Sequence, residues 1–319
     1  MQHGGGRVLV TGGAGFIGSH VAGAYLRAGY EVVVLDSLVH GRREQVPEGA
    51  DFVHADIRSP EAARLIGAGR FDVISHHAAQ VSVSRSVADP RFDASVNVDG
   101  LLNLLGAAAE AGVRRIQYVS SAAVYGPAGG AATRETAPKN PETPYGVSKL
   151  AGEQYLYYYH RVHGLDYVAM RYANVYGPRQ DPHGEAGVVA IYSARLQSGE
   201  PVSVFGDGEQ TRDFVYVGDV AEANVLLATA RIPAAGSLDD RAFNVGTGRQ
   251  TSVNRLAETF MEVSGVRVPR QHLPERPGDV LRSGLDASRL GRQGWTPRTE
   301  LADGLEALWE HVQCELVMA

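Results

Sequence analysis

The chain has 319 residues, of which 44% are hydrophobic and 21% charged, with a formal net charge of -6 and one cysteine, Cys314. This composition indicates a folded globular protein of one large or two smaller domains, and it excludes a basic binder of nucleic acid or anionic membranes. A single cysteine excludes an intrachain disulfide, and no signal peptide or bilayer-spanning apolar run is found, so we expect a cytoplasmic protein.

Short apolar strands alternate with helical segments in the first half of the chain. The pattern predicts strands at 7–11, 31–35, 51–55, 72–75, 115–120 and 165–171 and helices at 16–28, 89–111 and 144–163. Thr143 can cap the last of these helices, and Gly164 can end it. Such alternation predicts an α/β protein with a Rossmann doubly wound parallel sheet, covered on both faces.

The character of the sequence changes after Gly177-Pro178, where elements become shorter and loops longer. We therefore expect residues 1–178 to form the sheet domain. Residues 179–319 are expected to form a smaller C-terminal α/β part that binds the substrate, interleaved with the first and without a sharp boundary.

A glycine-rich loop joins the first predicted strand to the first helix. Gly12, Gly15 and Gly18 form G-x-x-G-x-x-G, a variant of the dinucleotide fingerprint. Glycines let the backbone turn tightly and approach a pyrophosphate, whose charge is stabilised at a helix N-terminus. The strand–loop–helix context predicts a dinucleotide cofactor.

The acid at the end of the second predicted strand selects between two such cofactors. Asp36 lies 18 residues after Gly18 and can accept both ribose hydroxyls of adenosine. It would repel a 2′-phosphate, so NAD is favoured over NADP, and the nearby Arg42 and Arg43 are assigned to a solvated loop. Asp56, after the third strand, is placed to hold the adenine amino group.

Ser121, Tyr145 and Lys149 are the candidate catalytic residues. Tyr145 and Lys149 are four positions apart on one predicted helix, so their side chains share a face. An ammonium beside a tyrosine, together with a positive nicotinamide ring, is expected to lower the pKa of the phenol from its usual value near ~10. With Ser121 closing the fifth strand, the pattern predicts a hydride-transfer site in which Tyr145 moves the proton.

Further motifs follow in order along nearly the whole chain. They are TGGAGFIGSH (11–20), HHAAQ (76–80), SSAAVYG (120–126), PYGVSK (144–149), RYANVYG (171–177), GDG (206–208) with Arg212-Asp213, and RPGD (276–279). In these motifs the chain resembles the extended short-chain dehydrogenases/reductases, specifically the UDP-glucose 4-epimerase group.

The resemblance implies two sets of binding residues and no metal site. It assigns NAD to Gly12, Gly15, Phe16, Ile17, Gly18, Asp36, Ser37, Asp56, Ile57, Ala78, Ala79, Asn97, Tyr145, Lys149 and Tyr172. It assigns the sugar nucleotide to Ser121, Tyr145, Asn174, Gly187, Val204, Phe205, Arg212, Arg276, Asp279 and Ser283. Within the second set, Phe205 is expected to pack on the base and the arginines to hold the diphosphate, whose oxygens suit a planar guanidinium.

Two alanines narrow the reaction that the resemblance implies. Related 4,6-dehydratases carry Asp-Glu after the active-site Ser/Thr, and UDP-glucuronate decarboxylases carry a Glu there, whereas this chain has Ala122 and Ala123. Alanine cannot move a proton, which disfavours dehydration and decarboxylation. The reaction implied is oxidation at C4, rotation of the 4-keto sugar and return of the hydride to its other face.

The resemblance also places a gate beside the sugar at Ser283. A bulky tyrosine there is associated with hexoses only, and a small residue with acceptance of an N-acetyl group, so UDP-GlcNAc and UDP-GalNAc become candidate substrates beside UDP-glucose and UDP-galactose. An ordinary loop serine, with other residues closing the pocket, is an equally good interpretation.

Several alternatives stay open. A UDP-glucuronate 4-epimerase would need a cation facing the carboxylate, and none is assigned; a dTDP-sugar 4-epimerase or ketoreductase, or a non-catalytic NAD-binding regulator, would fit parts of the pattern. By analogy with the family, helices 89–111 and 145–163 are expected to pair two chains into a homodimer. The stripe Leu101, Leu104, Leu105 and Ala108 fits that interface or the core equally well.

Overall fold

The computed structural model describes residues 5–127, 132–182, 187–233, 236–275 and 281–318, with side chains described as far as Cys314. Its centre is a sheet of seven parallel strands in the order β11-β6-β5-β4-β1-β2-β3. The strands are β1 (Arg7–Thr11), β2 (Glu31–Asp36), β3 (Asp51–His54), β4 (Val73–His76), β5 (Arg115–Ser121), β6 (Asp166–Tyr172) and β11 (Ala242–Val245). The strand order reverses between β1 and β4, and ligands of such sheets bind at the carboxyl ends of the strands beside that point. The predicted Rossmann sheet is confirmed.

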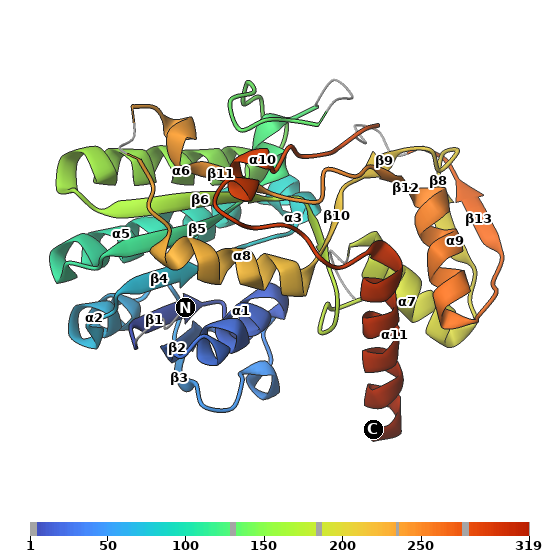
Figure 1. Cartoon of the computed structure of the whole chain (residues 1–319), viewed down its shortest axis with the longest axis horizontal. Coiled ribbons are helices and arrows are strands. Elements are labelled where there is room, and N and C mark those ends of the chain that lie inside the picture. The colour runs from blue at the N-terminus through green and yellow to red at the C-terminus, as the bar shows by residue number, and fades with distance from the viewer. Residues whose placement is uncertain (1–4, 128–131, 183–186, 234–235, 276–280, 319) are drawn as a thin grey trace.

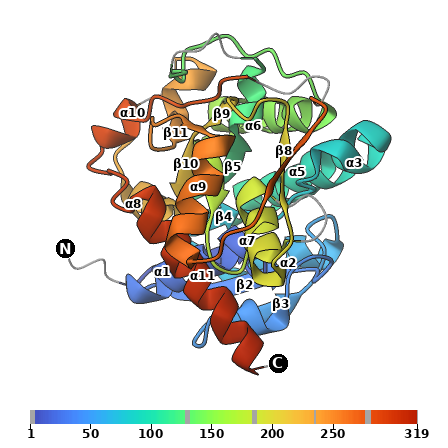
Figure 2. The same cartoon turned by 90° about the vertical axis from the view of Figure 1, so that its right-hand side faces the viewer.

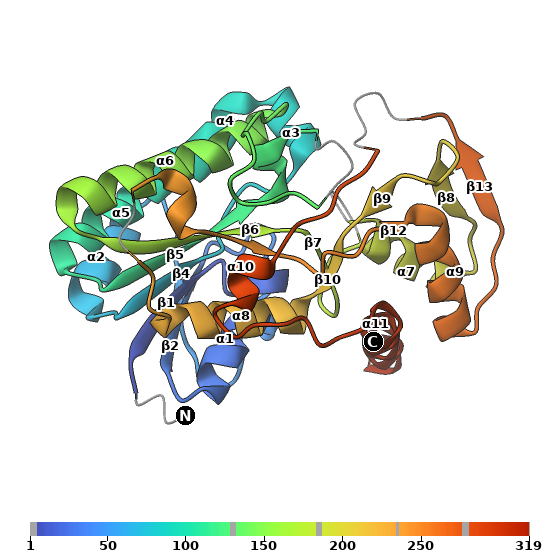
Figure 3. The same cartoon turned by 45° about the horizontal axis from the view of Figure 1, so that its top comes forward.

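Helices cover both faces of the sheet, as Figure 3 shows. One face carries α2 (Pro60–Gly69), α5 (Gly100–Ala111) and α6 (Pro144–His163), which share one apolar cluster with the strands. The other face carries α1 (Phe16–Arg27) and α8 (Val217–Thr229), which contribute to a second cluster. Apolar side chains therefore alternate between two cores on opposite faces of each central strand.

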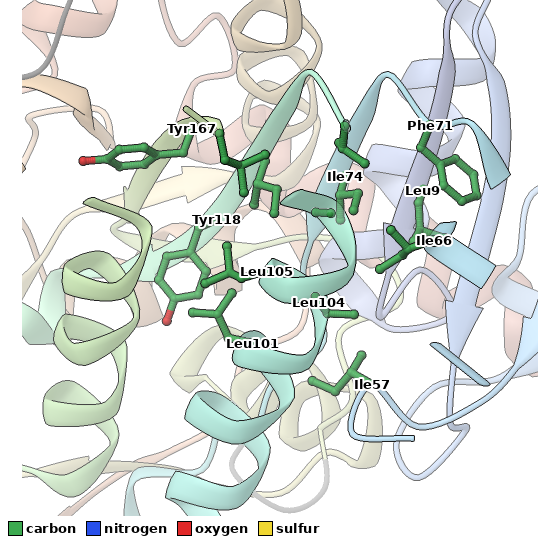
Figure 4. Close-up of a cluster of buried hydrophobic side chains, with 14 of the residues drawn as sticks. Leu9, Ile57, Ile66, Phe71, Ile74, Leu101, Leu104, Leu105, Tyr118 and Tyr167 are labelled. Carbon is green, nitrogen blue, oxygen red and sulfur yellow. The ribbon is translucent and has the colours of Figure 1, made fainter. Parts of the chain in front are cut away.

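The leucine stripe of α5 belongs to the first of these cores. Leu101, Leu104, Leu105 and Ala108 are each 0% exposed, and Figure 4 shows Leu101 and Leu105 beside Tyr118 of the sheet. Of the two interpretations left open by the sequence, the core one is therefore correct. Any surface for a second chain must come from other residues.

The predicted helix 89–111 is interrupted by one wider turn. The segment consists of α4 (Pro90–Ala94), a π-helical turn (Ser95–Asp99) and α5. A π-turn adds a residue to the helix repeat and is found mostly at functional sites. Here it turns Asn97, which is 2% exposed, towards the loop that follows β4. A short helix, α3 (Val83–Ala88), precedes the segment.

Helix α6 begins and ends where the sequence predicts. The Thr143 hydroxyl accepts a hydrogen bond from Gly146 N at 3.1 Å, Pro144 occupies the first turn, and Gly164 ends the helix with a φ of +71°. This start fixes the direction in which the first two turns of α6 present Tyr145 and Lys149.

A second, smaller unit lies beside the sheet (Figures 1 and 2). Its apolar cluster joins α7 (Val188–Ser198), β8 (Val202–Phe205), α9 (Val253–Ser264) and α11 (Leu301–Met318), and β8 pairs with β13 (Arg270–Leu273). The strands β7 (Asn174–Tyr176) and β10 (Phe214–Tyr216) pair with each other, as do β9 (Thr211–Arg212) and β12 (Thr251–Ser252).

The two units are interleaved along the chain. After residue 178, α8 returns to cover the main sheet and β11 extends it beside β6. The short helix α10 (Ser288–Gly291) packs near β11. We keep the division at residue 178 as a proposal about which segments serve the cofactor and which the substrate. None of the described helices has the length and apolar character that a membrane crossing requires.

Candidate active site

Three predicted catalytic side chains meet where β5 ends and α6 begins. Ser121 ends β5 and caps the 3-10 turn Ala122–Tyr125 by accepting a hydrogen bond from Ala123 N. A hydrogen bond joins the side chains of Ser121 and Tyr145. The Lys149 ammonium donates to the Val119 carbonyl at 2.9 Å and lies 5.8 Å from the centre of the Tyr145 ring. The structure thus assembles Ser121, Tyr145 and Lys149 into one site.

Burial dominates the ionisation of this site. Loss of hydration raises the pKa of Tyr145 to about 12, although the hydrogen bond with Ser121 acts in the opposite direction. Burial lowers the pKa of Lys149 to about 8, and this side chain is 3% exposed. The expected lowering of the Tyr145 pKa is therefore not produced by the chain's own groups. Desolvation dominates because the phenolate loses its water on burial.

A buried ion pair supports the site from behind. Arg171 and Glu153 are both 0% exposed, and the guanidinium contacts the carboxylate through Nε at 2.9 Å and Nη2 at 2.5 Å. The same carboxylate accepts a hydrogen bond from Ser120 Oγ at 2.6 Å. Glu153 lies one turn after Lys149, and Ser120 precedes Ser121, so the pair ties α6 to the end of β5. The sequence around Ser120 and Arg171 contains no local pattern that predicts their contacts with Glu153.

The glycine-rich loop has the shape that a dinucleotide needs. Gly12 has a φ of +68°, and a Cβ on it would meet Ala78 N at 2.6 Å. A Cβ on Gly18 would meet Gly12 O at 2.1 Å. Helix α1 starts after Gly15 with no side-chain cap and no acidic residue in its first turn. Its first N–H groups, those of Phe16 and Ile17 included, therefore suit a pyrophosphate.

Asp36 sits at the end of β2 with its carboxylate held in place. It is 7% exposed and accepts hydrogen bonds from Ala14 N at 3.0 Å and Leu38 N at 2.8 Å. The carboxylate thus links the glycine-rich loop to the residues after β2, beginning with Ser37. A carboxylate fixed there suits two ribose hydroxyls and opposes a 2′-phosphate, so the chain's residues fit NAD.

The remaining predicted cofactor residues lie along the same edge of the sheet. Asp56 is held by Arg58 at 2.6 Å, while Ile57 is buried under Gly100. Ala78 and Ala79 follow β4, where Asn97 accepts a hydrogen bond from Gln80 N and donates one to Gln80 O. Tyr172 ends β6 and accepts a hydrogen bond from Asn224 at 2.7 Å.

Three predicted substrate residues converge on one short segment, 211–213. Asn174 N donates to the Asp213 carbonyl at 2.9 Å, and Ser283 N donates to the Thr211 carbonyl at 3.1 Å. Arg212 lies between these two acceptors on β9. Residues separated by more than 100 positions in the sequence are thereby brought to one side of the site.

Asp213 is a clamp whose role the sequence did not reveal. It is 1% exposed, and its carboxylate accepts hydrogen bonds from the backbone of Thr247 at 2.8 Å, Gly248 at 3.0 Å and Leu285 at 3.2 Å. It therefore fixes the strand end that carries Arg212 against the segment that leads from Ser283. Its place after Arg212 in the motif is the only sequence signal that could have found it.

For the other predicted substrate residues, the structure shows at most their burial and their position in the smaller unit. Val204 is 0% exposed and lies in the core of the smaller unit. Phe205 is partly buried, and Gly187 is exposed at the start of α7. Arg276 and Asp279 lie outside the described residues.

Comparisons with known proteins agree with this geometry. A model of the NAD dependent epimerase/dehydratase family matches residues 8–246. The UDP-glucose 4-epimerase of Mycolicibacterium smegmatis is 46% identical over 306 residues, covering 94% of this chain and 96% of that protein.

Solved structures show the same fold over nearly the whole chain. The UDP-glucose 4-epimerase of Thermotoga maritima, crystallised with UDP-glucose, is 41% identical with a TM-score of 0.92 and covers 97% of this chain and 99% of its own. The UDP-glucose 4-epimerase of Thermus thermophilus, in complex with NAD, is 44% identical with a TM-score of 0.89, covering 96% and 99%.

Proposed function

The chain belongs to the NAD dependent epimerase/dehydratase family, and we propose that within this family it is a UDP-hexose 4-epimerase that retains NAD between turnovers. The observation that carries the proposal is the assembly of Ser121, Tyr145 and Lys149 beside a segment that holds only alanines, Ala122 and Ala123. That arrangement can move a proton at one hydroxyl, and it offers no second acid at these positions for elimination.

Each catalytic side chain has a distinct task in this proposal. NAD, when bound, supplies a hydride acceptor that later returns the hydride. Tyr145 takes the proton of the sugar 4-hydroxyl, and Ser121 relays or bridges it through the hydrogen bond that joins the two side chains. Lys149 carries a buried positive charge beside the phenol and would hold the nicotinamide ribose. The 4-keto sugar then turns and is reduced on its other face.

The nucleotide must stay fixed while the sugar turns. Arg212, Asn174 and Ser283 meet at residues 211–213, and Asp213 holds the chain after Ser283 in place through Leu285 N. A guanidinium there can bond diphosphate oxygens through two N–H groups at once. Phe205 at the end of β8 is the candidate for packing on uracil.

The finer specificity that we propose is interconversion of UDP-glucose and UDP-galactose, extended to UDP-GlcNAc and UDP-GalNAc by the small Ser283. Ser283 is partly buried beside β9, and its main chain is held by Thr211. A tyrosine at this position would fill the space that an N-acetyl group requires.

Replacing Ser283 by tyrosine should therefore lower kcat/KM for UDP-GalNAc by about 10²-fold or more, the cost of excluding a group from a pocket, while UDP-galactose turnover changes little. Ser283→Ala is the matched control and should leave both substrates unaffected. The rates are compared by NMR of the product sugars. Equal losses with both substrates would show that Ser283 is not the gate.

Retention of the cofactor separates the epimerase from a ketoreductase. An epimerase returns each hydride to the same sugar and needs no cofactor exchange, whereas a ketoreductase must exchange its cofactor at every turnover. The test is gel filtration of the protein followed by denaturation and quantification of released NAD. About one equivalent per chain supports the proposal, and an empty protein that turns over only with added NADH contradicts it.

We further propose that the chain forms a homodimer through the outer face of α6. This face exposes Val147 (53%), Tyr155 (38%), Tyr158 (50%) and Val162 (59%), and Val87 on α3 is 62% exposed. Exposed apolar side chains gathered on one face of a helix are typical of an interaction site.

Substituting glutamate for Val162 should turn the dimer into a monomer, because two like charges would be buried at a two-fold contact. Leu281→Glu is the matched control, since Leu281 is 75% exposed but lies in the other unit, next to β9. Light scattering at micromolar concentration measures the mass. A native protein that is already monomeric there would refute the dimer.

A further inference from the structure

Asp93 is a buried carboxylate with no assigned task. It lies on α4, is 1% exposed, and its Oδ1 accepts hydrogen bonds from Gln80 Nε2 at 2.8 Å and Asn97 Nδ2 at 3.1 Å. Among the described residues no ion pair joins it to a lysine, arginine or histidine. A carboxylate buried against two neutral amides is costly unless a positive charge lies near it, so its retention calls for an explanation.

The two amides that Asp93 holds connect three segments around the reaction site. Gln80 follows β4 and also binds the backbone of Ser82 through its side chain. Asn97, on the π-helical turn, binds both backbone groups of Gln80 and the hydroxyl of Ser148 at 3.2 Å. Ser148 in turn donates to the Tyr145 carbonyl at 3.0 Å. A chain of hydrogen bonds therefore leads from Asp93 to the first turn of α6.

Lys149 directly follows Ser148, which the hydrogen bonds from Asp93 reach through Asn97, and its ammonium interacts electrostatically with Asp93. The negative charge of Asp93 is the one that raises the pKa of Lys149 against the effect of burial, and it also raises the pKa values of Tyr145 and Tyr118. The acid one turn after Lys149 on α6 is Glu153, and its carboxylate is already paired with Arg171.

The remaining titratable groups around Lys149 carry no negative charge at neutral pH. The phenols of Tyr118 and Tyr145 lie 5.2 Å and 5.8 Å from its nitrogen, measured to the ring centres, and burial raises both pKa values. His76, which ends β4, and His77, which follows it, have pKa values lowered to about 3 by burial, with Lys149 contributing, so both are neutral.

We propose that Asp93 is a positioning residue of the reaction site: it balances the buried charge of Lys149 and locks Gln80 and Asn97 against the first turn of α6. Without the carboxylate, Lys149 gives up its proton at lower pH, and above that pH it lacks the positive charge beside Tyr145. The inference deepens the proposed function, because it concerns the same site, but its direct test needs no turnover.

The chain offers a simple measurement because it contains only two lysines, Lys139 and Lys149. Protein labelled with ¹³C at lysine Cε gives two NMR signals, which are assigned with a Lys139→Arg variant. Asp93→Asn keeps an oxygen that can accept from both amides and removes only the charge. In this variant the titration midpoint of Lys149 is expected to fall by about one pH unit, the scale of a nearby opposite charge. Lys139, paired with Asp239, should titrate as in the native protein.

Two further variants isolate the charge. Asp99→Asn removes an exposed carboxylate from the π-helical turn that follows α4 and should leave the Lys149 midpoint unchanged. Asp93→Glu retains the charge and should keep a native-like Lys149 midpoint with a reduced kcat. This variant still tests the proposal if the Asp93→Asn protein does not fold. The alkaline limb of the pH–kcat profile should move to lower pH in Asp93→Asn alone.

An unchanged Lys149 midpoint in folded Asp93→Asn would overturn the proposal, as would an Asp93→Glu midpoint displaced as far as expected for Asp93→Asn. If the midpoint moves as expected in a protein that does not epimerise UDP-hexoses, the role of Asp93 stands and the proposed function falls. The two ideas can therefore fail separately.

Discussion

Replacing Tyr145 by phenylalanine is expected to lower kcat by about 10²- to 10⁴-fold, the range for loss of a positioned general acid–base group. The substitution removes one hydroxyl, which is joined to Ser121 by a hydrogen bond, and leaves the ring and the Lys149 ammonium in place. Because the cofactor contacts of the glycine-rich loop and Asp36 are untouched, the variant should retain as much NAD as the native protein. Both kcat and retained NAD are measured on the same preparation.

The matched control for this variant is Tyr155→Phe. Tyr155 lies on the same helix, on the face proposed for dimer contact and outside the reaction site, so removing its hydroxyl should alter kcat by less than about twofold. A Tyr145→Phe protein that kept near-native kcat would show that another group moves the proton.

Removing the carboxylate of Glu153 is expected to lower the free energy of unfolding by about 3–5 kcal/mol. This is the usual cost of removing one partner of a buried ion pair and leaving the charge of the other without its counter-ion. Arg171 is 0% exposed and would keep only its contacts with Asp239 at 3.1 Å, the Tyr125 hydroxyl at 3.0 Å and the Glu135 carbonyl at 2.8 Å. Urea unfolding of Glu153→Leu against the native protein measures the change.

An exposed pair in the same chain provides the comparison. Arg195 and Glu200 form an ion pair with both side chains about half exposed, so Glu200→Leu should cost no more than about 1 kcal/mol. The double variant Glu153→Leu with Arg171→Met should recover much of the loss, because it removes both buried charges. A loss of less than about 1 kcal/mol in Glu153→Leu would contradict a supporting role for the pair.

Local patterns were enough to predict much of the fold and the centre of the site. The strands at the start of the chain are continuous apolar runs, and α6 carries its own start and stop signals in Thr143, Pro144 and Gly164. The glycine-rich loop, Asp36 and the Tyr145–Lys149 spacing each depend on a few neighbouring residues. Such features can be recognised without knowledge of the tertiary structure.

Features that depend on distant partners could not be predicted in this way. The π-turn at Asn97 interrupts a helix whose periodicity looks continuous, and the stripe at Leu101 gives the same pattern for a core as for an interface. The burial of Asp93, Glu153 and Asp213 was not visible either, since acidic residues are usually exposed unless tertiary contacts hold them. The return of β11 to the main sheet likewise rests on a pairing across about 70 residues with β6.

The most direct test of the central claim is turnover of UDP-hexoses by the purified protein without added cofactor. UDP-galactose and UDP-GalNAc are incubated separately, and the products are followed by NMR. The account predicts conversion of UDP-galactose to UDP-glucose without net formation of NADH, and conversion of UDP-GalNAc to UDP-GlcNAc if Ser283 leaves the gate open. Failure to convert either sugar nucleotide, even with NAD supplied, would contradict the assignment as a UDP-hexose 4-epimerase, and UDP-glucuronate and dTDP-hexoses would then be the next substrates to test.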